Sequence, residues 1–237
     1  MISKAVCLLL STLFASALAQ VKSPKMPSLM YYVPSHPSTD NSTFANTDYV
    51  QDYHIQIDWD YVFWGNSTLS GSITHEMNVI QDTDFVTFDI WDLTIINVTS
   101  TAPGSAKTAT KNGHRVALGD TELLWNVQTK DPGSGQVLTI QLDSTAVEGS
   151  EIGIQIFYMT SPTANALTWL KPAQTAGGVY PYMFSQCEDI NCRSVAPLQD
   201  TPSVKYTYGA CVTVDNDVTP YMSANITSTK ALDSDTL

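Results

Sequence analysis

The segment PYMFSQCEDINCR, residues 181–193, places several chemically capable side chains within one short stretch. It contains an amide, Gln186, a carboxylate, Glu188, and two cysteines, Cys187 and Cys192. A carboxylate can accept a charge-assisted hydrogen bond from an ammonium group, and an amide can orient a polar ligand beside it. The alternative is that both side chains are solvated and inert, because most exposed carboxylates bind nothing.

Other reaction types need residue spacings that this sequence lacks. The segment from His75 to Val79 begins like the zincin motif H-E-x-x-H, but Val79 stands where the second histidine ligand would be. The segment also alternates apolar and polar residues, so we interpret His75 as an ordinary strand histidine. A G-x-S-x-G elbow and phosphate-binding loops are absent from the sequence. We therefore predict no catalytic residue and no metal ligand in this chain.

Residues 1–19 predict a secretory signal peptide. Lys4 supplies the positive start, residues 5–15 the apolar segment, and residues 17–19 a small-residue cleavage site before Gln20. The apolar run is too short to span a bilayer as an ordinary membrane helix, so we expect cleavage and no membrane anchor; the alternative is a retained signal anchor. Secretion would make the Asn-X-Ser/Thr sequons meaningful as glycosylation sites. These predicted sites are Asn41, Asn66, Asn97 and Asn225.

Three cysteines remain after Cys7 is assigned to the signal peptide: Cys187, Cys192 and Cys211. A bridge between Cys187 and Cys192 is sterically possible. An odd number of cysteines in an oxidising compartment leaves at least one thiol outside any disulfide, and we expect that thiol to be buried.

Composition restricts the class of protein and its partners. Of 237 residues, 43% are hydrophobic and 14% are charged, which is typical of a globular domain. The formal net charge of −12 makes nucleic acid and anionic membranes poor partners.

Period-two alternation from about residue 50 predicts an all-β fold. One face of the first run is predicted to carry Tyr53, Ile55, Ile57, Trp59 and Tyr61. The same pattern aligns Ile73, Met77 and Val79, and then Val86, Phe88 and Ile90. Strands spaced by turns, with no long helical run, predict a sandwich or several packed sheets. We divide the chain into the signal peptide at 1–19, a flexible leader at 20–49, a β domain at 50–225 and a polar tail at 226–237.

Residues 165–214 resemble the amino-terminal domain of leukotriene A4 hydrolase and related zinc aminopeptidases, the peptidase M1 family. The runs ALTWL, PYMFSQCE, NCR and QDTPSVKYTY stand in the order found in that family. The resemblance extends more loosely over residues 50–225. It implies a saddle of β-sheets and a loop that projects into an active site built mainly by the next domain. On that loop, Glu188 would contact the α-amine of the substrate and Gln186 would line the first side-chain pocket.

The resemblance carries three further implications. It implies that Cys187 and Cys192 are packing thiols, because cytosolic relatives have them too. It also implies structural roles for Arg193, Asp200 and Pro202. Leukotriene A4 hydrolase itself has glutamine where this chain has Glu188, so the carboxylate favours a plain aminopeptidase.

The catalytic parts of that family do not occur in this sequence: the G-x-M-E-N loop, the H-E-x-x-H zinc site and the oxyanion tyrosine. We therefore expect the substrate-anchoring amino-terminal part of a secreted zinc aminopeptidase, not catalytic alone. Its partners would be a peptide amino terminus and the missing catalytic domain, which would hold the zinc; no cofactor is expected in this chain. The fold would be truncated before its last strands, leaving an open sheet edge.

Two alternatives remain. The chain could be a stand-alone, non-catalytic secreted β-sandwich that binds a partner. It could also be a different enzyme that uses Glu188 and Asp189 as paired carboxylates, although adjacent residues on a strand would face opposite ways.

Overall fold

Strands and short 3-10 helices make up the regular structure that a computed structural model describes for this chain. The described residues are 40–103, 108–111, 114–117, 121–131, 135–215 and 217–229. The predicted signal peptide, the leader up to residue 39 and the tail from residue 230 lie outside them. Within the described residues, no helix is long and apolar enough to cross a membrane.

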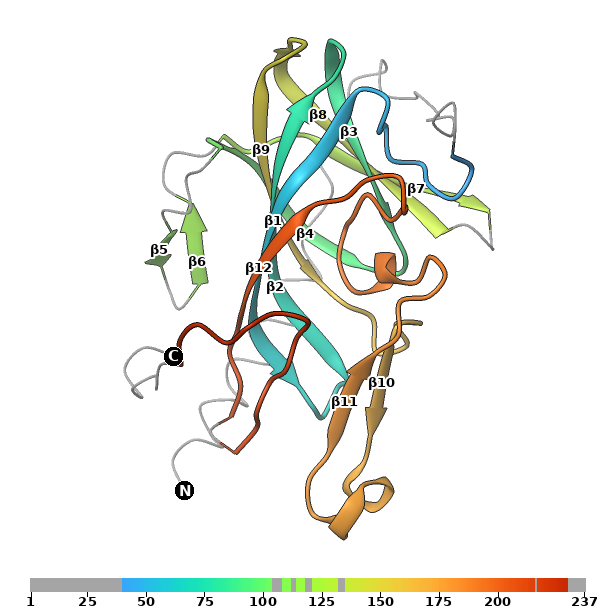
Figure 1. Cartoon of the computed structure of the whole chain (residues 1–237), viewed down its shortest axis with the longest axis vertical. Helices are drawn as coiled ribbons and strands as arrows, with labels where there is room; N and C mark the ends of the chain where they lie inside the picture. Colours follow the sequence, from blue (N-terminus) through green and yellow to red (C-terminus); the bar gives the residue numbers. More distant parts are fainter. Residues whose placement is uncertain are drawn as a thin grey trace.

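The described residues form four sheets, whose arrangement is seen in Figure 1. The largest has five strands, in the order β12 (Thr207–Val212), β1 (Val50–Phe63), β2 (Thr68–Val79), β9 (Glu151–Met159) and β4 (Thr94–Thr101). A second sheet has the order β3 (Thr83–Ile90), β8 (Gly135–Ala146) and β7 (Trp125–Asp131). The other two sheets are two-stranded hairpins: β5 (Thr108–Lys111) with β6 (His114–Ala117), and β10 (Leu167–Leu170) with β11 (Tyr182–Ser185). The all-β, multi-sheet prediction is confirmed.

The pairing is antiparallel except between β1 and β12, which run parallel. Parallel neighbours need a long connection, and here the chain from β2 to β11 lies between them. In the described sheet β12 is an outer strand, since it pairs only with β1.

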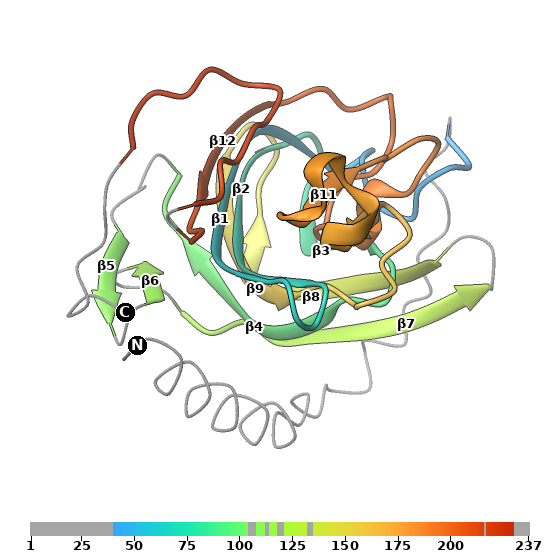
Figure 2. The same cartoon turned by 90° about the horizontal axis from the view of Figure 1, so that it is seen from below.

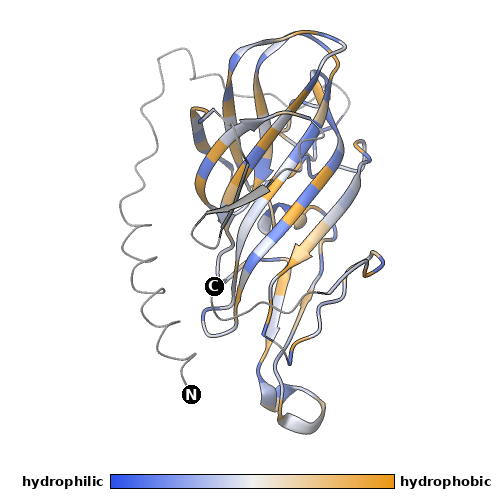
Figure 3. Cartoon of the chain, turned by 90° about the vertical axis from the view of Figure 1, so that its left-hand side faces the viewer, coloured by the Kyte–Doolittle hydropathy of each residue, from blue (hydrophilic) through white to orange (hydrophobic). Residues whose placement is uncertain are grey.

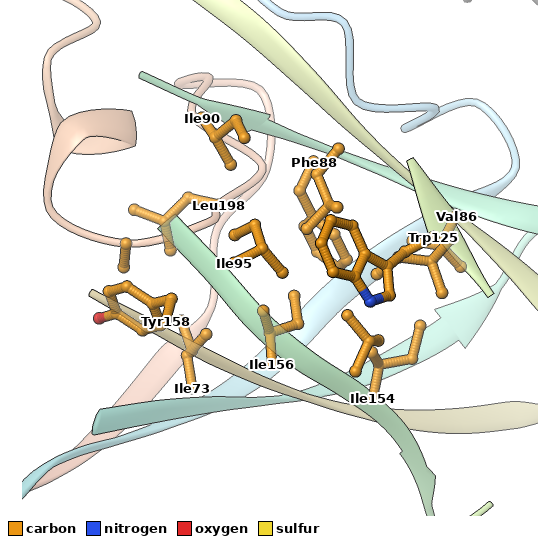
Figure 4. Packing of buried hydrophobic residues seen from close by; sticks show 14 of the residues in the cluster. Ile73, Val86, Phe88, Ile90, Ile95, Trp125, Ile154, Ile156, Tyr158 and Leu198 are labelled. Atoms are coloured by element: carbon orange, nitrogen blue, oxygen red, sulfur yellow. The ribbon is translucent and has the colours of Figure 1, made fainter. Parts of the chain in front are cut away.

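The main hydrophobic core lies between the five-stranded and three-stranded sheets, which face each other in Figure 2. Ile73, Ile154 and Ile156 enter it from the first sheet, and Phe88 and Ile140 from the second. Figure 4 shows Phe88 of the second sheet facing Ile154 and Ile156 of the first, with Tyr158 and Leu198 at one end of the cluster. Each sheet therefore buries one face against the other, which is the main stabilising contribution in a sandwich.

Side-chain alternation confirms two of the predicted faces. The strand β2 buries Ile73, Met77 and Val79, and His75 lies in the same phase. The strand β3 packs Val86, Phe88 and Ile90 into the main core, whereas Thr87 and Asp89 on its other face are buried beneath residues 43–46, which hydrogen-bond to them. The alternation is visible in Figure 3 as successive hydrophobic and hydrophilic bands along the strands.

The predicted face of β1 is wrong at its beginning. A register shift between Asp52 and His54 reverses the phase of the strand, as an inserted residue does in a β-bulge. Asp52 therefore points inward, where its carboxylate oxygens lie 3.1 Å from Nδ1 of buried His75. Tyr53 turns outward instead, and its hydroxyl lies 3.3 Å from Oε2 of the exposed Glu151.

The predicted leader of residues 20–49 extends too far. Residues 43–47 are buried. The backbone N–H of Asn46 donates to Thr87 Oγ1, and the N–H of Thr87 donates to Asn46 Oδ1. These polar residues have no hydrophobic period, but their side chains satisfy backbone groups of β3. The ordered domain therefore includes residues 40–49.

The predicted glycosylation sites differ in exposure. Asn41, Asn66 and Asn225 are exposed, and Asn66 lies in the turn between β1 and β2. Asn97 is half-buried on β4, the other outer strand of the described five-stranded sheet. Glycosylation at the four sites stays a prediction.

The packing between the two large sheets predicts the effect of truncating a core side chain. Ile156→Ala should lower the free energy of unfolding by about 2–5 kcal/mol, because it leaves a cavity between the sheets. Val147→Ala is the control, since Val147 is 58% exposed and should change stability by less than about 0.5 kcal/mol. Urea unfolding of both variants measures the difference, and equal losses would contradict the assigned core.

Candidate functional site

The hairpin of β10 and β11 extends away from the main sheets (Figure 1). Its register pairs Leu167 with Ser185 at the base and Leu170 with Tyr182 toward the tip. The tip contains the 3-10 helices η2 (Pro172–Gln174) and η3 (Ala176–Gly178). The hydroxyl of Thr175 donates to the carbonyl oxygen of Tyr180 across the tip. Residues 186–188 follow directly at the base.

The inner face of the hairpin packs on the domain body. A small satellite cluster there consists of Leu69, Ala164, Ala166, Leu167 and Val195. Trp169, Met183 and Cys187 pack against this cluster. The Trp169 ring also meets the Trp64 ring edge-on, with ring centroids 5.2 Å apart. The hairpin is therefore held by apolar contacts at its base.

The outer face of the hairpin is aromatic and exposed. Tyr182 and Phe184 alternate with Met183 on β11, so they share the face away from the satellite cluster. Tyr182 is 56% and Phe184 is 40% exposed, and their rings stack with centroids 6.0 Å apart. We did not predict this aromatic face. The alternation of Tyr180, Tyr182, Phe184 and Gln186 in the sequence was the signal that could have revealed it.

Gln186 and Glu188 follow β11 at the base of this hairpin, and both side chains are exposed. The N–H of Gln186 donates to the carbonyl oxygen of Ala166 at 2.8 Å, which extends the ladder one step beyond β11. Residues 188–191 form a turn, in which the Asn191 side-chain amide donates to the carbonyl oxygen of Glu188 at 2.7 Å. Glu188 and Asp189 lie in this turn and not on a strand, so the strand geometry considered for paired carboxylates does not apply.

The two cysteines of this loop form a disulfide. Cys187 and Cys192 have Cα atoms 4.6 Å apart. The interpretation of these residues as packing thiols is therefore wrong. The turn brings them together, because the N–H of Asn191 donates to the carbonyl oxygen of Cys187 and reverses the chain between them.

The predicted burial of the remaining thiol is also wrong. Cys211 lies outside the disulfide and is exposed on the outer strand β12. Its neighbour Ala210 packs against the main core, so strand alternation turns Cys211 outward.

Directly after the disulfide, Arg193 is 1% exposed and joins three segments. Its Nε donates to Asp200 Oδ2 at 2.9 Å, and its Nη2 donates to the carbonyl oxygen of Ser42 at 2.8 Å. The third guanidinium nitrogen, Nη1, lies 3.6 Å from Asp89 Oδ1. The structural interpretation of Arg193 and Asp200 is confirmed: together they fasten the loop to β3 and to the segment before β1.

Asp89 is the buried counterpart of Arg193. It accepts hydrogen bonds from the Phe44 N–H at 2.8 Å, the Asp200 N–H at 3.2 Å and the Thr43 hydroxyl. Burial raises the pKa of Asp89 to about 6, against the lowering effect of Arg193 and of these donors. The position is therefore sensitive to any change that removes the guanidinium.

A metal site is not formed by the residues that the structure describes, since no group of three or more His, Cys, Asp or Glu side chains could hold an ion there. His75 contributes to packing instead, with its ring 4.2 Å from the Phe88 ring and its Nδ1 beside Asp52. The described residues therefore do not fit the zinc that the family resemblance implies for the whole enzyme.

Comparison with known proteins places this fold and loop in a family. The family model of the peptidase M1 N-terminal domain matches residues 47–236. The chain therefore belongs to the peptidase M1 family, as an amino-terminal domain.

Individual relatives agree with this assignment. The chain is 41% identical over 110 residues to leukotriene A-4 hydrolase of Xenopus laevis, covering 46% of this chain and 18% of that protein. It is 32% identical over 204 residues to leucine aminopeptidase 2 of Yarrowia lipolytica, covering 81% of this chain and 27% of the relative. Native leukotriene A4 hydrolase from Saccharomyces cerevisiae superposes with a TM-score of 0.61 at 25% identity, over 79% of this chain and 27% of that chain. This sequence thus spans about a quarter or less of these proteins.

The buried guanidinium predicts a large loss of stability when it is removed. Arg193→Met keeps most of the side-chain length but leaves Asp89 without its cation, and should cost about 3–5 kcal/mol of unfolding free energy. Lys205→Met is the matched control, because Lys205 is exposed and its loss should change stability by less than about 0.5 kcal/mol. Chemical denaturation measures both, and a near-neutral Arg193→Met would contradict the anchoring role.

The raised pKa of Asp89 predicts that the stability of the domain depends on pH. Its folded pKa of about 6 lies above the ordinary value of 3.8. Between these pH values the folded protein keeps a proton that the unfolded chain has released. Stability should therefore fall as pH rises through this window, with a slope of up to about 1.4 kcal/mol per pH unit from this group.

Asp89→Asn should remove that contribution. The difference in unfolding free energy between the variant and the wild type should therefore change between about pH 4 and about pH 6. Asp92→Asn is the control on an exposed carboxylate and should keep the wild-type slope. Urea unfolding at about pH 4 and about pH 6 provides the comparison. A parallel pH dependence in Asp89→Asn and the wild type would refute the assignment.

Proposed function

We propose that this chain is the amino-terminal, substrate-anchoring part of a secreted zinc aminopeptidase, and that it is not catalytic by itself. The observation that carries the proposal is the loop of Gln186 and Glu188. Both side chains are exposed, while the residues around them are fastened by a disulfide and by the buried Arg193. An exposed pair on a rigid base is suited to contact a ligand bound beside the domain.

The proposed ligand of Glu188 is the free α-ammonium group of a peptide. A carboxylate and an ammonium form a charge-assisted hydrogen bond, which contributes about 1.5–3 kcal/mol when water is excluded. Such a contact also sets the register, so that only the first peptide bond of the substrate reaches the catalytic metal. Gln186 would line the pocket for the first side chain. Leucine aminopeptidase 2 of Yarrowia lipolytica, to which this chain is similar, supports this class of reaction by its name.

The aromatic face of the hairpin supports a neighbouring catalytic domain. Tyr182 and Phe184 are large, exposed and stacked on the side of β11 that faces away from the satellite cluster. Aromatic side chains of this kind are enriched in interfaces. The relatives are about four times as long as their matched region, so their chains include a further part that could cover such a face. Zinc would be held by that part, since the described residues do not form a site for it.

Secretion and glycosylation belong to the same proposal. The signal-like residues 1–19 support entry into the secretory pathway. Exposed sequons at Asn41, Asn66 and Asn225 support attachment of glycans, and the Cys187–Cys192 disulfide is of the kind that persists in oxidising compartments.

The deciding experiment is to determine the native product. Its transcript is read past the codon for Leu237, and its intact mass is measured before and after enzymatic deglycosylation. Continuation into G-x-M-E-N and H-E-x-x-H, with hydrolysis of amino-terminal residues from peptides, is the expected result. A stop after Leu237 would overturn the proposal in favour of a stand-alone secreted binding module.

In that native product, Glu188→Ala should raise KM for peptides with a free amino terminus by about 10- to 100-fold, which corresponds to the loss of about 1.5–3 kcal/mol. Asp189→Ala is the matched control, because Asp189 is the exposed neighbour in the same turn and should leave KM unchanged. Steady-state kinetics on a tripeptide provides both values. Equal effects of the two substitutions would argue against an amine anchor at Glu188.

A further inference from the structure

We propose that the Cys187–Cys192 disulfide is a redox-sensitive positioning element for the loop that carries Gln186 and Glu188. The oxidised bond holds the turn against the domain, and a dithiol reductant releases it. The effect on substrate rests on the proposed function, whereas the effect on the loop itself does not.

The two sulfurs belong to different packing units. Cys187 packs against the satellite cluster beneath the hairpin, and Cys192 packs against the main core between the sheets. The disulfide therefore ties the base of the projecting hairpin to the domain body. Glu188 lies inside the ring that this bond closes, and Gln186 lies immediately before it.

The contacts that do not involve sulfur predict that reduction of the disulfide affects the loop and not the whole domain. Before the ring, Gln186 donates to the carbonyl oxygen of Ala166, and after it Arg193 is held by Asp200. Neither contact involves sulfur, so both persist when the bond is cleaved. Inside the ring, Asn191 donates two hydrogen bonds, to the carbonyl oxygens of Cys187 and Glu188. The carbonyl oxygens of Asn191 and Cys192 accept hydrogen bonds from residues 194–196, so the end of the ring stays attached to the domain, and the described hydrogen bonds hold its first half only through Asn191. Reduction should therefore loosen residues 187–192 without unfolding the domain.

The chemistry is thiol–disulfide exchange. A thiolate of the dithiol attacks one sulfur of the pair, the other cysteine leaves as a thiolate and is protonated, and the second thiol of the reductant closes its own disulfide. Two electrons pass to the protein, and two cysteine thiols and one oxidised dithiol result. Cys187 and Cys192 are each half-buried, and Glu188 and Asp189 beside them are exposed, so the bond lies at the surface where a small reductant can reach it.

The bond would make the position of Glu188 depend on the compartment. In an oxidising lumen the ring is closed and the carboxylate is held in place. In a reducing environment the same residues are thiols in a looser turn, and the carboxylate samples more positions. Looser positioning weakens a directional contact, because ordering the turn then opposes binding.

The first test measures the loop without any substrate. Hydrogen–deuterium exchange is followed in the native product with and without dithiothreitol, and in the Cys187→Ser/Cys192→Ser variant without reductant. Exchange of the Asn191 amide, which donates to the carbonyl oxygen of Cys187, should accelerate about tenfold or more in the reduced protein and in the variant, with β3 and β8 unchanged. The Cys211→Ser variant is the control and should respond to dithiothreitol as the wild type does. Unchanged exchange in this loop, or equal acceleration throughout the domain, would overturn the proposal.

The second test separates positioning from a merely structural role. Reduction should raise KM for a peptide with a free amino terminus severalfold, with kcat unchanged, and the double serine variant should match it without reductant. In a Glu188→Ala background, reduction should produce no further rise. A loosened loop with an unchanged KM in the wild type would overturn the positioning role. An unchanged KM in Glu188→Ala itself would instead refute the proposed amine anchor, while the exchange experiment would still decide whether the loop responds to reduction.

Discussion

The loop and the domain body depend on one buried charge. Arg193 is almost fully removed from water, which is tolerated only because its donors are taken up by Asp200, by Asp89 and by the carbonyl oxygen of Ser42. Each acceptor comes from a different part of the chain. The same ion cluster therefore fixes the segment before β1, the end of β3 and the turn after the disulfide, and the exposed Glu188 acquires a rigid base without being buried itself.

The hairpin adds a second level of order to this base. Its inner side chains pack on a satellite cluster that is separate from the main core, so it can project while its base stays fixed. Its outer side chains, Tyr182 and Phe184, remain exposed next to the loop. In the proposed function, Glu188 is the polar anchor for the ligand, and the aromatic strip of Tyr182 and Phe184 is the face that meets a neighbouring domain.

Periodicity predicted the strands of the sandwich well, since a strand with one buried face must alternate. It was wrong where backbone irregularity or polar contacts decided burial. At Asp52 a bulge reversed the phase of β1. At Asn46 and Thr43, hydrogen bonds to β3 drew a segment without hydrophobic pattern into the domain. Neither effect leaves a local pattern in the sequence, because each depends on a partner distant along the chain.

The sequence by itself determined the fold class and the family, because alternation and short ordered motifs are local properties of the chain. The same motifs predict Gln186 and Glu188 as the polar residues of the candidate site, and their binding role stays a prediction. Only the tertiary structure decided that Cys187 and Cys192 are bonded, that Arg193 is buried among acceptors from three segments, and that Tyr182 and Phe184 remain exposed. The physical reason is that bonding, burial and exposure are set by which distant segments come together. A side chain of given type can be an inert surface group or the anchor of a loop, and its surroundings determine which.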